Sequence, residues 1–592
     1  MINVEGFVAQ LALDAVVALY GDVNPSMVQI QATRKEFEGD YTMVTFPLLK
    51  LSRKSPEQTA NELGEYIVSH SADVESYNVI KGFLNLSLTS QYWSARFADV
   101  ESNEMFGLVD APSERTIMVE YSSPNTNKPL HLGHIRNNLL GWSVAEILKA
   151  NGHKVLKVNL VNDRGIHICK SMLAWQLYGN GETPASSGMK GDHLVGKYYV
   201  EFDKHYKAQV KELIEGGASE DDAKRDAPVM QAAQAMLRKW EEGDSEVRTL
   251  WEMMNGWVYE GFDVTYKSLG VDFNKVYYES QTYLLGKKLV EDGLARGIFH
   301  RKEDGSVWID LREDGLDEKL LLRGDGTSVY MTQDLGTAVS RFDEEALDDM
   351  IYVVGNEQNY HFDVLKLILG KLGYEWSKNI THLSYGMVEL PNGRMKSREG
   401  TVVDADDLIA GMVDDAREIS QSAGKTDGLS EAQICDISTM VGLGALKYFI
   451  LKVDPKKTML FDPAESIDFN GNTGPFVQYT HARICSLLRK AEEQGLRGAE
   501  YAVCGDAERE LIKQIIAFEG AVRAAGDSYS PSIIAAYGYE LAKMYNGYYH
   551  DHPMLKESDD QQRNLRLALS YSVARTLRQA MSLLGITVPQ RM

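Results

Sequence analysis

Two histidines one helical turn apart stand where a strand pattern gives way to a helix pattern. His131 and His134 flank Gly133 at the end of the run Pro-Asn-Thr-Asn-Lys-Pro-Leu-His-Leu-Gly-His, residues 124–134. Backbone N–H groups at a helix start attract anions, and glycine lets a phosphate approach the backbone closely. Both imidazoles can reach the same phosphoryl group. The segment therefore indicates a phosphate or nucleotide site.

A short His-x-Gly-His pattern has two other interpretations. It fits a helix start that arose by chance, and His131 and His134 could also offer two metal ligands. No third Cys, His or acidic ligand is obviously placed to complete such a metal site. The sequence contains no G-x-x-x-x-G-K-[ST] pattern, which excludes a P-loop ATPase. The strand–loop–helix context favours nucleotide binding.

A second candidate is the basic loop Asn-Gly-Arg-Met-Lys-Ser-Arg-Glu-Gly at residues 392–400, which follows a strand-like run. Taken alone, it is compatible with an ordinary surface turn. Taken with the histidine motif, its Arg394, Lys396 and Arg398 offer cations for the charge that develops on a transferring phosphoryl group.

Polar residues at strand ends indicate the substrate. Glu120 and Asn125 flank the end of one strand pattern, and Gln358 lies just past another. Ligands of doubly wound sheets bind at the carboxyl ends of the strands. Tyr330 and Asp334 are four residues apart, on one face if the segment is helical. A carboxylate such as Asp334 suits the rigid donor fork of a guanidinium. Each residue alone is equally compatible with a surface polar group or a cap.

The elements around these residues alternate. Strand patterns at about 116–120 and 154–161 enclose a helix pattern at 132–151, which predicts a βαβ unit with a right-handed crossover. A strand at 350–354, a helix at 360–372 and a strand-like run at 380–388 continue the pattern. The predicted fold class is α/β: a Rossmann-like, doubly wound parallel sheet with an insertion, an N-terminal α+β domain and a C-terminal all-α bundle.

The remaining segments set the expected domain boundaries. Residues 1–110 begin with a helical pattern, and strand-like runs follow at 43–49 and 77–88. The catalytic unit covers 111–405, with charged helices and short strands inserted at about 185–325. From about 406 the chain reads helical, as a linker over 406–475 and a separate helical domain over 476–592. In the latter, Tyr479, His481 and Arg483 offer aromatic and cationic surfaces for unpaired bases, or else pack in the bundle.

The amino-acid composition further limits the class of protein. The chain has 592 residues, a formal net charge of −23 and four scattered cysteines. The cysteine spacing makes a disulfide framework or zinc knuckle improbable and fits a reducing cytoplasm. We find no run of about 18 apolar residues and no basic region followed by an apolar stretch at the start, so we expect neither a membrane span nor a secretory signal.

The net charge argues against bulk attraction to nucleic acid. Residues 476–592, however, carry 14 Lys+Arg against 13 Asp+Glu, so a local RNA-binding patch is compatible with the composition.

Together these segments resemble one enzyme family. The stretch from Val119 to His134 resembles the HIGH signature of class I aminoacyl-tRNA synthetases, in the version typical of arginyl-tRNA synthetases. The basic loop is similar to their KMSKS loop, although Arg394 stands where the first lysine is expected and Lys396 and Ser397 follow in a different order. Residues 472–483 and 584–592 resemble parts of the helical anticodon-binding domain. The N-terminal module resembles the extra domain that touches the tRNA elbow.

The resemblance implies roles for individual residues. In the arginine pocket, Asp334 would hold the guanidinium and Tyr330 would pack beside it. Glu120, Asn125 and Gln358 would bind polar groups of the amino acid. A lysine before the HIGH motif compensates in this family for an altered KMSKS loop, and Lys128 fits that role. The implied catalytic residues are His131, His134, Lys128, Lys396 and Arg398. The implied ATP-binding residues are Pro124, Gly133, His131, His134, Met395 and Ser397. The implied arginine-binding residues are Glu120, Asn125, His131, Tyr330, Asp334 and Gln358, and the implied tRNA-binding residues are Tyr479, His481 and Arg483.

The expected activity is that of an arginine–tRNA ligase. The family activates L-arginine with ATP and transfers it to the 2′-hydroxyl of the terminal adenosine of tRNA(Arg). We expect magnesium to arrive with ATP rather than in a protein cage. We expect a cytoplasmic protein with neither membrane nor DNA as a partner. Two alternatives remain. The altered loop is compatible with a catalytically silent relative that binds RNA. A class I synthetase for another amino acid is the second alternative, and Tyr330 and Asp334 argue against it.

Overall fold

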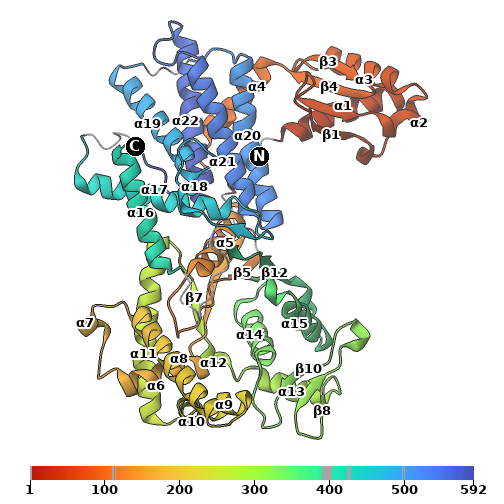
Figure 1. The fold of residues 1–592 in the computed structure, drawn as a ribbon. Coiled ribbons are helices and arrows are strands. Elements are labelled where there is room, and N and C mark those ends of the chain that lie inside the picture. The colour runs from red at the N-terminus through yellow and green to blue at the C-terminus, as the bar shows by residue number, and fades with distance from the viewer. Residues whose placement is uncertain are drawn as a thin grey trace.

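The structure is a computed structural model that describes residues 3–109, 113, 115–389, 403–422, 428–496, 498 and 500–592. The molecule is elongated (Figure 1). A small α+β domain projects at one end beside a bundle of C-terminal helices, and a sheet flanked by helices forms the other end.

The central sheet has five strands, and every neighbouring pair is parallel. Its order is β12-β11-β5-β6-β7, with the strands β5 (Thr116–Glu120), β6 (Lys154–Val161), β7 (Lys275–Tyr278), β11 (Asp349–Gly355) and β12 (Ile380–Tyr385). The chain winds outward from β5 in one direction and from β11 in the other. The topological switch point, where such sheets bind ligands, is therefore at the carboxyl ends of β5 and β11. The predicted doubly wound parallel sheet is confirmed.

Helix α5 (Leu132–Ala150) is the crossover from β5 to β6 and is almost entirely buried. Burial on all sides explains why its sequence lacks a clear polar face. The helix stops where the sequence predicts, at Asn151, and Gly152 follows with a φ of 85° that suits glycine. Helices α14 (Tyr330–Glu345) and α15 (Asn359–Lys371) flank β11 in sequence.

The predicted insertion differs from the structure in one respect. Residues 185–325 contain β7, which is an edge strand of the main sheet. The chain thus leaves the sheet twice. The first excursion is helical, with α6 (Ile166–Tyr178), α7 (Pro184–Ser187), α8 (Gly191–Glu215), α9 (Glu220–Asp226), α10 (Pro228–Glu242) and α11 (Ser245–Leu269). The second holds α12 (Glu279–Thr282), α13 (Gly286–Ala295) and an antiparallel sheet of β8 (His300–Arg301), β9 (Val307–Ile309) and β10 (Lys319–Leu322). Four residues, Lys-Val-Tyr-Tyr, are too few to produce a recognisable strand pattern.

The N-terminal domain packs three helices, α1 (Val4–Tyr20), α2 (Leu49–Ser52) and α3 (Pro56–His70), with a sheet of order β1-β2-β4-β3. Its strands are β1 (Gln29–Ala32), β2 (Tyr41–Val44), β3 (Val74–Ile80) and β4 (Phe83–Leu88). The prediction of one strand over 77–88 was wrong, because Lys81 and Gly82 both adopt positive φ and turn the chain into a hairpin. The run at 43–49 also splits, since the chain becomes helical after β2.

The C-terminal part is helical, as predicted, apart from β14 (Met459–Leu460), which pairs with β13 (Val388–Glu389). Its helices include α16 (Ala405–Ser422), α17 (Glu431–Leu451), α18 (Pro463–Ser466), α19 (Gly474–Glu493), α20 (Asp506–Ser528), α21 (Pro531–Asp551) and α22 (Asp560–Leu583). Among the described residues, α17 alone is long and apolar enough to cross a membrane by length and composition. It packs against α16, α19 and α5, and its apolar side chains belong to the protein core.

Candidate active site at the switch point

A cavity of about 1000 Å³ opens at the carboxyl ends of β5 and β11. Side chains from three separate parts of the sequence line it: Glu120, Asn125, Tyr330, Asp334 and Gln358. These are five of the six residues that the resemblance assigns to one amino-acid site, and the fold brings them together as expected. The sixth, His131, lies at the adjoining start of α5 and is not among the described residues that line this cavity.

The cavity is rich in carboxylates. Besides Glu120 and Asp334, it is lined by Glu279 at the start of α12. Burial raises the pKa of Glu279 to about 7; Arg164 opposes this shift, and Asp163 and Asp334 add to it. The same cavity is also lined by the cations Arg164, Lys287 and Arg323, so it offers opposite charges both to positive groups and to a carboxylate of a ligand.

Asp334 already has one partner. Its Oδ2 lies 2.6 Å from Nε2 of His361 on α15. The contact fixes the carboxylate across the gap between α14 and α15. The other carboxylate oxygen, Oδ1, is left to accept from a ligand, because a carboxylate can accept at both oxygens.

Glu120 is held from behind by a buried arginine. The Arg341 guanidinium on α14 pairs with Glu120 Oε2 and lies 4.5 Å from the centre of the Tyr277 ring. Arg341 is 0% exposed, so Glu120 supplies the opposite charge that a buried guanidinium needs. Ser123 Oγ donates to the second oxygen, Oε1, at 3.3 Å. Arg341 and Asp334 are seven residues apart, on one face of α14.

Tyr330 begins α14 and lines the same cavity as Asp334, with 73% of its surface exposed. It is therefore open to a ligand that enters the cavity, and its packing beside the guanidinium stays a prediction.

The two signature histidines form a reciprocal cap at the start of α5. His131 Nδ1 accepts from the Gly133 N–H at 3.1 Å, and His134 Nδ1 accepts from the His131 N–H at 3.2 Å. The ring centres are 4.0 Å apart. A Cβ on residue 133 would lie 2.9 Å from the His131 ring, which explains the glycine. Because each Nδ1 accepts, each ring carries its proton on Nε2 and can donate it to an anion.

Burial keeps both imidazoles neutral. It lowers the pKa of His131 to about 4, with the nearby Lys128 charge contributing and Asp404 opposing. It also lowers the pKa of His134 well below its usual value, and His131 and Lys128 add to the effect. Burial lowers the pKa of Lys128 as well. The Pro124 carbonyl accepts from the Asn162 N–H at 2.9 Å, which ties the start of the signature loop to the end of β6.

Five residues of the basic loop lie outside the described residues: Arg394, Met395, Lys396, Ser397 and Arg398. Val403, which comes after this segment, is described, and its carbonyl accepts from the Leu132 N–H at 3.1 Å. Val403 therefore lies beside the histidine motif.

Sequence reasoning missed several residues that line the cavity, among them Arg164, Glu279 and His361. Arg164 follows β6, so the rule that ligands bind at strand ends could have found it. Glu279 follows a four-residue strand that the pattern did not reveal. His361 lies in a helix pattern and carries no signal of its own.

A second hollow, of about 700 Å³, lies in the helical bundle and is lined by Tyr479, Arg483, Tyr549 and Met592 among others. The Arg483 guanidinium stacks 4.8 Å from the Tyr479 ring centre and donates to Asn546 at 2.7 Å. His481 does not join them. It is 2% exposed, and its Nδ1 lies 3.0 Å from the Pro589 carbonyl oxygen. The expectation that His481 offers a surface to bases is therefore corrected: alternate residues of α19 face opposite ways.

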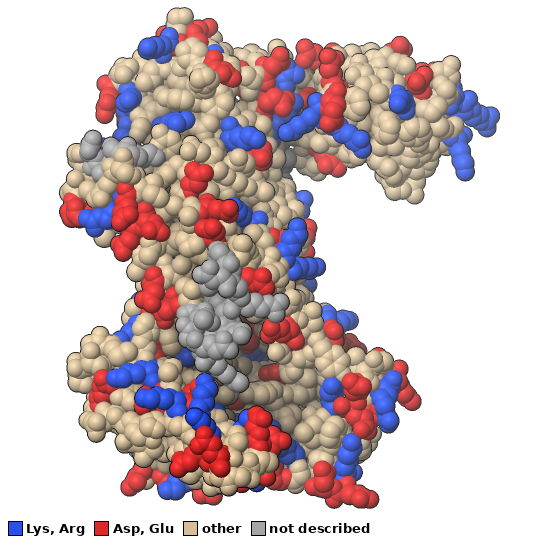
Figure 2. All heavy atoms as spheres, in the orientation of Figure 1, with Lys and Arg blue, Asp and Glu red and all other residues tan. Residues whose placement is uncertain are grey.

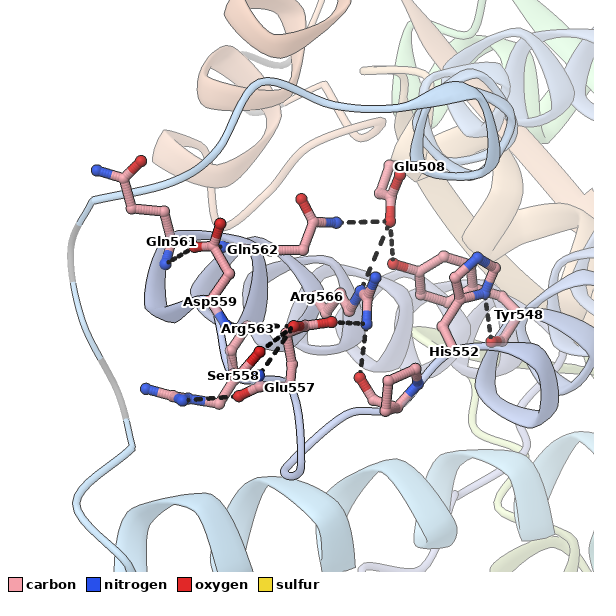
Figure 3. Close-up of polar contacts among 11 residues, drawn as sticks. Glu508, Tyr548, His552, Glu557, Ser558, Asp559, Gln561, Gln562, Arg563 and Arg566 are labelled. Carbon is pink, nitrogen blue, oxygen red and sulfur yellow. Dashed lines mark hydrogen bonds and ion pairs between the residues drawn. The ribbon is translucent and has the colours of Figure 1, made fainter.

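A polar network holds the connection between α21 and α22, which forms one wall of this hollow (Figure 3). Glu508 accepts from Tyr548 at 2.8 Å and from Gln562 at 2.9 Å. Arg566 donates to Glu557 at 2.8 Å and to the Pro553 carbonyl at 2.7 Å. Such charge-assisted bonds within a bundle fix the loop path more firmly than apolar packing alone.

Comparison with known proteins identifies relatives along the whole chain. The family described as tRNA synthetases class I (R), catalytic domain, matches residues 99–462. The DALR anticodon binding domain matches 477–592, and the arginyl tRNA synthetase N-terminal domain matches 8–88. The arginine–tRNA ligase of Bacteroides thetaiotaomicron is 59% identical over 100% of both chains. That of Porphyromonas gingivalis W83 is 55% identical over 98% of both.

Solved structures agree with this relationship. The arginyl-tRNA synthetase of Thermus thermophilus superposes with a TM-score of 0.78 at 25% identity, covering 100% of both chains. That of Plasmodium falciparum gives 0.75 at 18% identity, covering 100% of this chain and 99% of the other, which supports the fold alone.

Proposed function

Because the chain belongs to the arginyl-tRNA synthetase family and is an arginine–tRNA ligase, we propose that arginine is activated in the switch-point cavity. The observation that carries this proposal is the convergence of Glu120, Asn125, Asp334 and Gln358 on one cavity next to the His131–His134 cap. A recess with several carboxylates complements arginine, which carries two positive groups and one negative group.

The proposed pose follows from the positions of the carboxylates. Asp334 accepts from the guanidinium through the oxygen that His361 leaves available. Glu279 lines the same cavity, close enough to Asp334 for their charges to interact. Glu120, held by Arg341, accepts from the α-ammonium group. Asn125 and Gln358 bind the remaining polar groups, and Tyr330 closes the rim. This places the substrate carboxylate toward the start of α5.

ATP binds at that helix start in the proposed mechanism. His131 and His134 donate from Nε2 to the phosphates, Gly133 permits close approach, and Pro124 borders the same loop. The arginine carboxylate oxygen attacks the α-phosphorus and pyrophosphate leaves, so arginyl-adenylate forms. Magnesium arrives with ATP and screens the phosphate charge. Lys128, Lys396 and Arg398 supply further cations, with Met395 and Ser397 beside the nucleotide. Positioning and charge stabilisation carry the rate.

In the second step the 2′-hydroxyl of the terminal adenosine of tRNA(Arg) attacks the activated carbonyl, and AMP leaves. We assign the anticodon arm to the bundle hollow with Tyr479 and Arg483, whose ring and guanidinium suit stacking on unpaired bases. We assign the tRNA elbow to the N-terminal domain. Acidic and basic side chains intermingle on the face shown in Figure 2, so this RNA contact relies on local patches. We place the protein in the cytoplasm, with neither membrane nor DNA as a partner.

Arginine-dependent exchange of pyrophosphate into ATP tests the assignment. We expect exchange with arginine and none above background with lysine or methionine, and we expect tRNA(Arg) to stimulate it. A chain that binds tRNA(Arg) but shows no exchange under either condition would instead be the catalytically silent RNA-binding relative.

A further inference from the structure

Residues 403–405 pair directly with the histidine motif through backbone hydrogen bonds. The Leu132 N–H donates to the Val403 carbonyl at 3.1 Å, and the Ala405 N–H donates to the Leu130 carbonyl at 3.0 Å. His131 and Asp404 face each other across this antiparallel bridge. The backbone of His131 is therefore held by residues 403–405, so anything that fixes these residues also fixes the histidine.

Residues 404–406 are in turn held by the first excursion from the sheet. Nε2 of His193 on α8 lies 3.2 Å from Asp404 Oδ2 and 3.3 Å from Asp406 Oδ2. Lys190, which caps α8, pairs with Asp406 and donates to Thr265 of α11 at 2.7 Å. Thr265 donates to the second oxygen of Asp406 at 2.8 Å. We call these five residues, Lys190, His193, Thr265, Asp404 and Asp406, the clamp.

The charged members of the clamp are paired with opposite charges. Hydrogen bonds that His193 donates to Asp404 and to Asp406 raise the pKa of His193 to about 10, so the imidazolium persists at neutral pH. Burial alone would raise the pKa of Asp406, but bonds from His193 and Lys190 lower it. His193, Asp404 and Asp406 also have the chemistry of metal ligands, with atoms within 4.8 Å of one another. The Lys190 ammonium already supplies the positive charge at this point, which favours an ion-pair cluster.

The same helix touches the other side of the motif. A Cβ at Gly196 of α8 would lie 2.8 Å from Cδ of Pro129 and 3.6 Å from Cα of Lys128. Helix α8 thus lies in close contact with the loop that leads into His131, as well as with the segment that pairs with it. Asp192, fully buried beside Lys190, packs against Gly261 of α11 and joins the two helices.

We propose that α8 is a brace for the active site, in which Lys190 and His193 are positioning residues that hold His131 through Asp404 and Asp406. The inference rests on the proposed catalytic role of His131. The brace would give the helical excursion a function in catalysis as well as in covering the sheet. Holding His131 in place matters because a misplacement of about 1 Å at a phosphoryl-transfer site can lower the rate about 100-fold.

Hydrogen exchange of the full-length protein tests the mechanical link without relying on activity. In Lys190→Met, peptides that contain the amides of Leu132 and Ala405 should exchange at least about tenfold faster than in the native protein. Lys197→Met is the matched control, because Lys197 lies on the same helix and pairs with Glu182, away from the clamp. Equal protection in native protein, Lys190→Met and Lys197→Met would overturn the proposal.

Pyrophosphate exchange then separates positioning from binding. Lys190→Met and His193→Gln should each lower kcat about 10- to 100-fold while the KM for arginine changes less than about twofold. Lys190→Arg should restore most of the rate. His193 is partly exposed, so His193→Gln keeps the test open if Lys190→Met does not fold. His131→Ala is assayed in parallel: if it keeps full kcat, the proposed function of His131 fails, whereas a slow His131→Ala beside normal clamp variants refutes only the brace.

Discussion

His134 is the residue whose contribution to the chemistry is most sharply defined by its geometry. Its Nδ1 accepts from the His131 N–H, so Nε2 is the donor available to a phosphate. We predict that His134→Ala lowers kcat of pyrophosphate exchange by about 10²–10³-fold, the typical loss for one such donor, with a small change in the KM for ATP. Normal turnover in this variant would reduce the histidine motif to a helix cap.

In the proposed pose, Asp334 determines which amino acid the cavity binds. The change Asp334→Asn keeps the shape but removes the charge that faces the guanidinium. Charge-assisted hydrogen bonds contribute about 1.5–3 kcal/mol, so we predict that the KM for arginine rises about 10- to 150-fold while the KM for ATP stays within about threefold. Steady-state exchange kinetics measure both. If the KM for arginine barely moves, the guanidinium binds elsewhere.

The lowered pKa of His131 gives a prediction about pH. The folded protein should keep this ring neutral down to about pH 4, whereas an unfolded histidine takes up a proton near 6.5. Between these values the unfolded state binds more protons, so the contribution of His131 to stability is complete above about pH 6.5 and is lost as pH falls toward 4. Titration of ¹³C-histidine NMR signals, assigned with His131→Asn, measures the pKa; a midpoint near 6.5 would contradict the buried, neutral state.

At the scale of elements, long regular patterns of apolar residues predicted helices and strands correctly, whereas short elements were missed. The strands β5 and β6 and the helix α5 lie within a residue of their expected bounds, because each has an apolar pattern and a clear stop such as Asn151-Gly152. Strand β7 was hidden, since four residues between two excursions carry no periodicity. The β3–β4 hairpin was predicted as one strand, although Gly82 marks the turn, because apolar residues continue on both sides of Lys81 and Gly82.

The candidate site divides in the same way. The positions of Glu120, Asn125 and Gln358 at this cavity could be predicted, because strand ends mark them, whereas Asp334 was assigned through the family resemblance. Arg341, which holds Glu120, could not, since an arginine in a helix pattern reads as a surface residue until the fold buries it. The burial of His481 was hidden for a related reason: an aromatic helix gives the same sequence signal whichever of its faces packs inward.

At the scale of the whole molecule, the helical bundle is not an independent appendage. Ser143 of α5 donates to the Leu583 carbonyl, and Lys447 of α17 donates to that of Gly585, while one buried apolar cluster continues from α5 into α19–α22. Truncation at 476 would expose this core, so point variants test the RNA surface better. We predict that Arg483→Gln weakens tRNA(Arg) binding and reduces the salt dependence of log Kd by about one charge.

Lys211→Gln is the matched control for that prediction, because Lys211 is an exposed cation on α8, outside the bundle hollow. Fluorescence binding at several salt concentrations measures affinity and slope together. Equal slopes for the native protein and both variants would place the main RNA surface elsewhere, for example on the N-terminal domain.

The central claim is that arginine and ATP meet between the switch-point cavity and the start of α5. A crystal structure of the protein with arginine and a non-hydrolysable ATP analogue tests it most directly. We predict that the guanidinium lies within hydrogen-bonding distance of Asp334, the ammonium beside Glu120, and the α-phosphate beside Nε2 of His131 and His134. A guanidinium bound away from Asp334, or phosphates that do not contact the start of α5, would contradict the account.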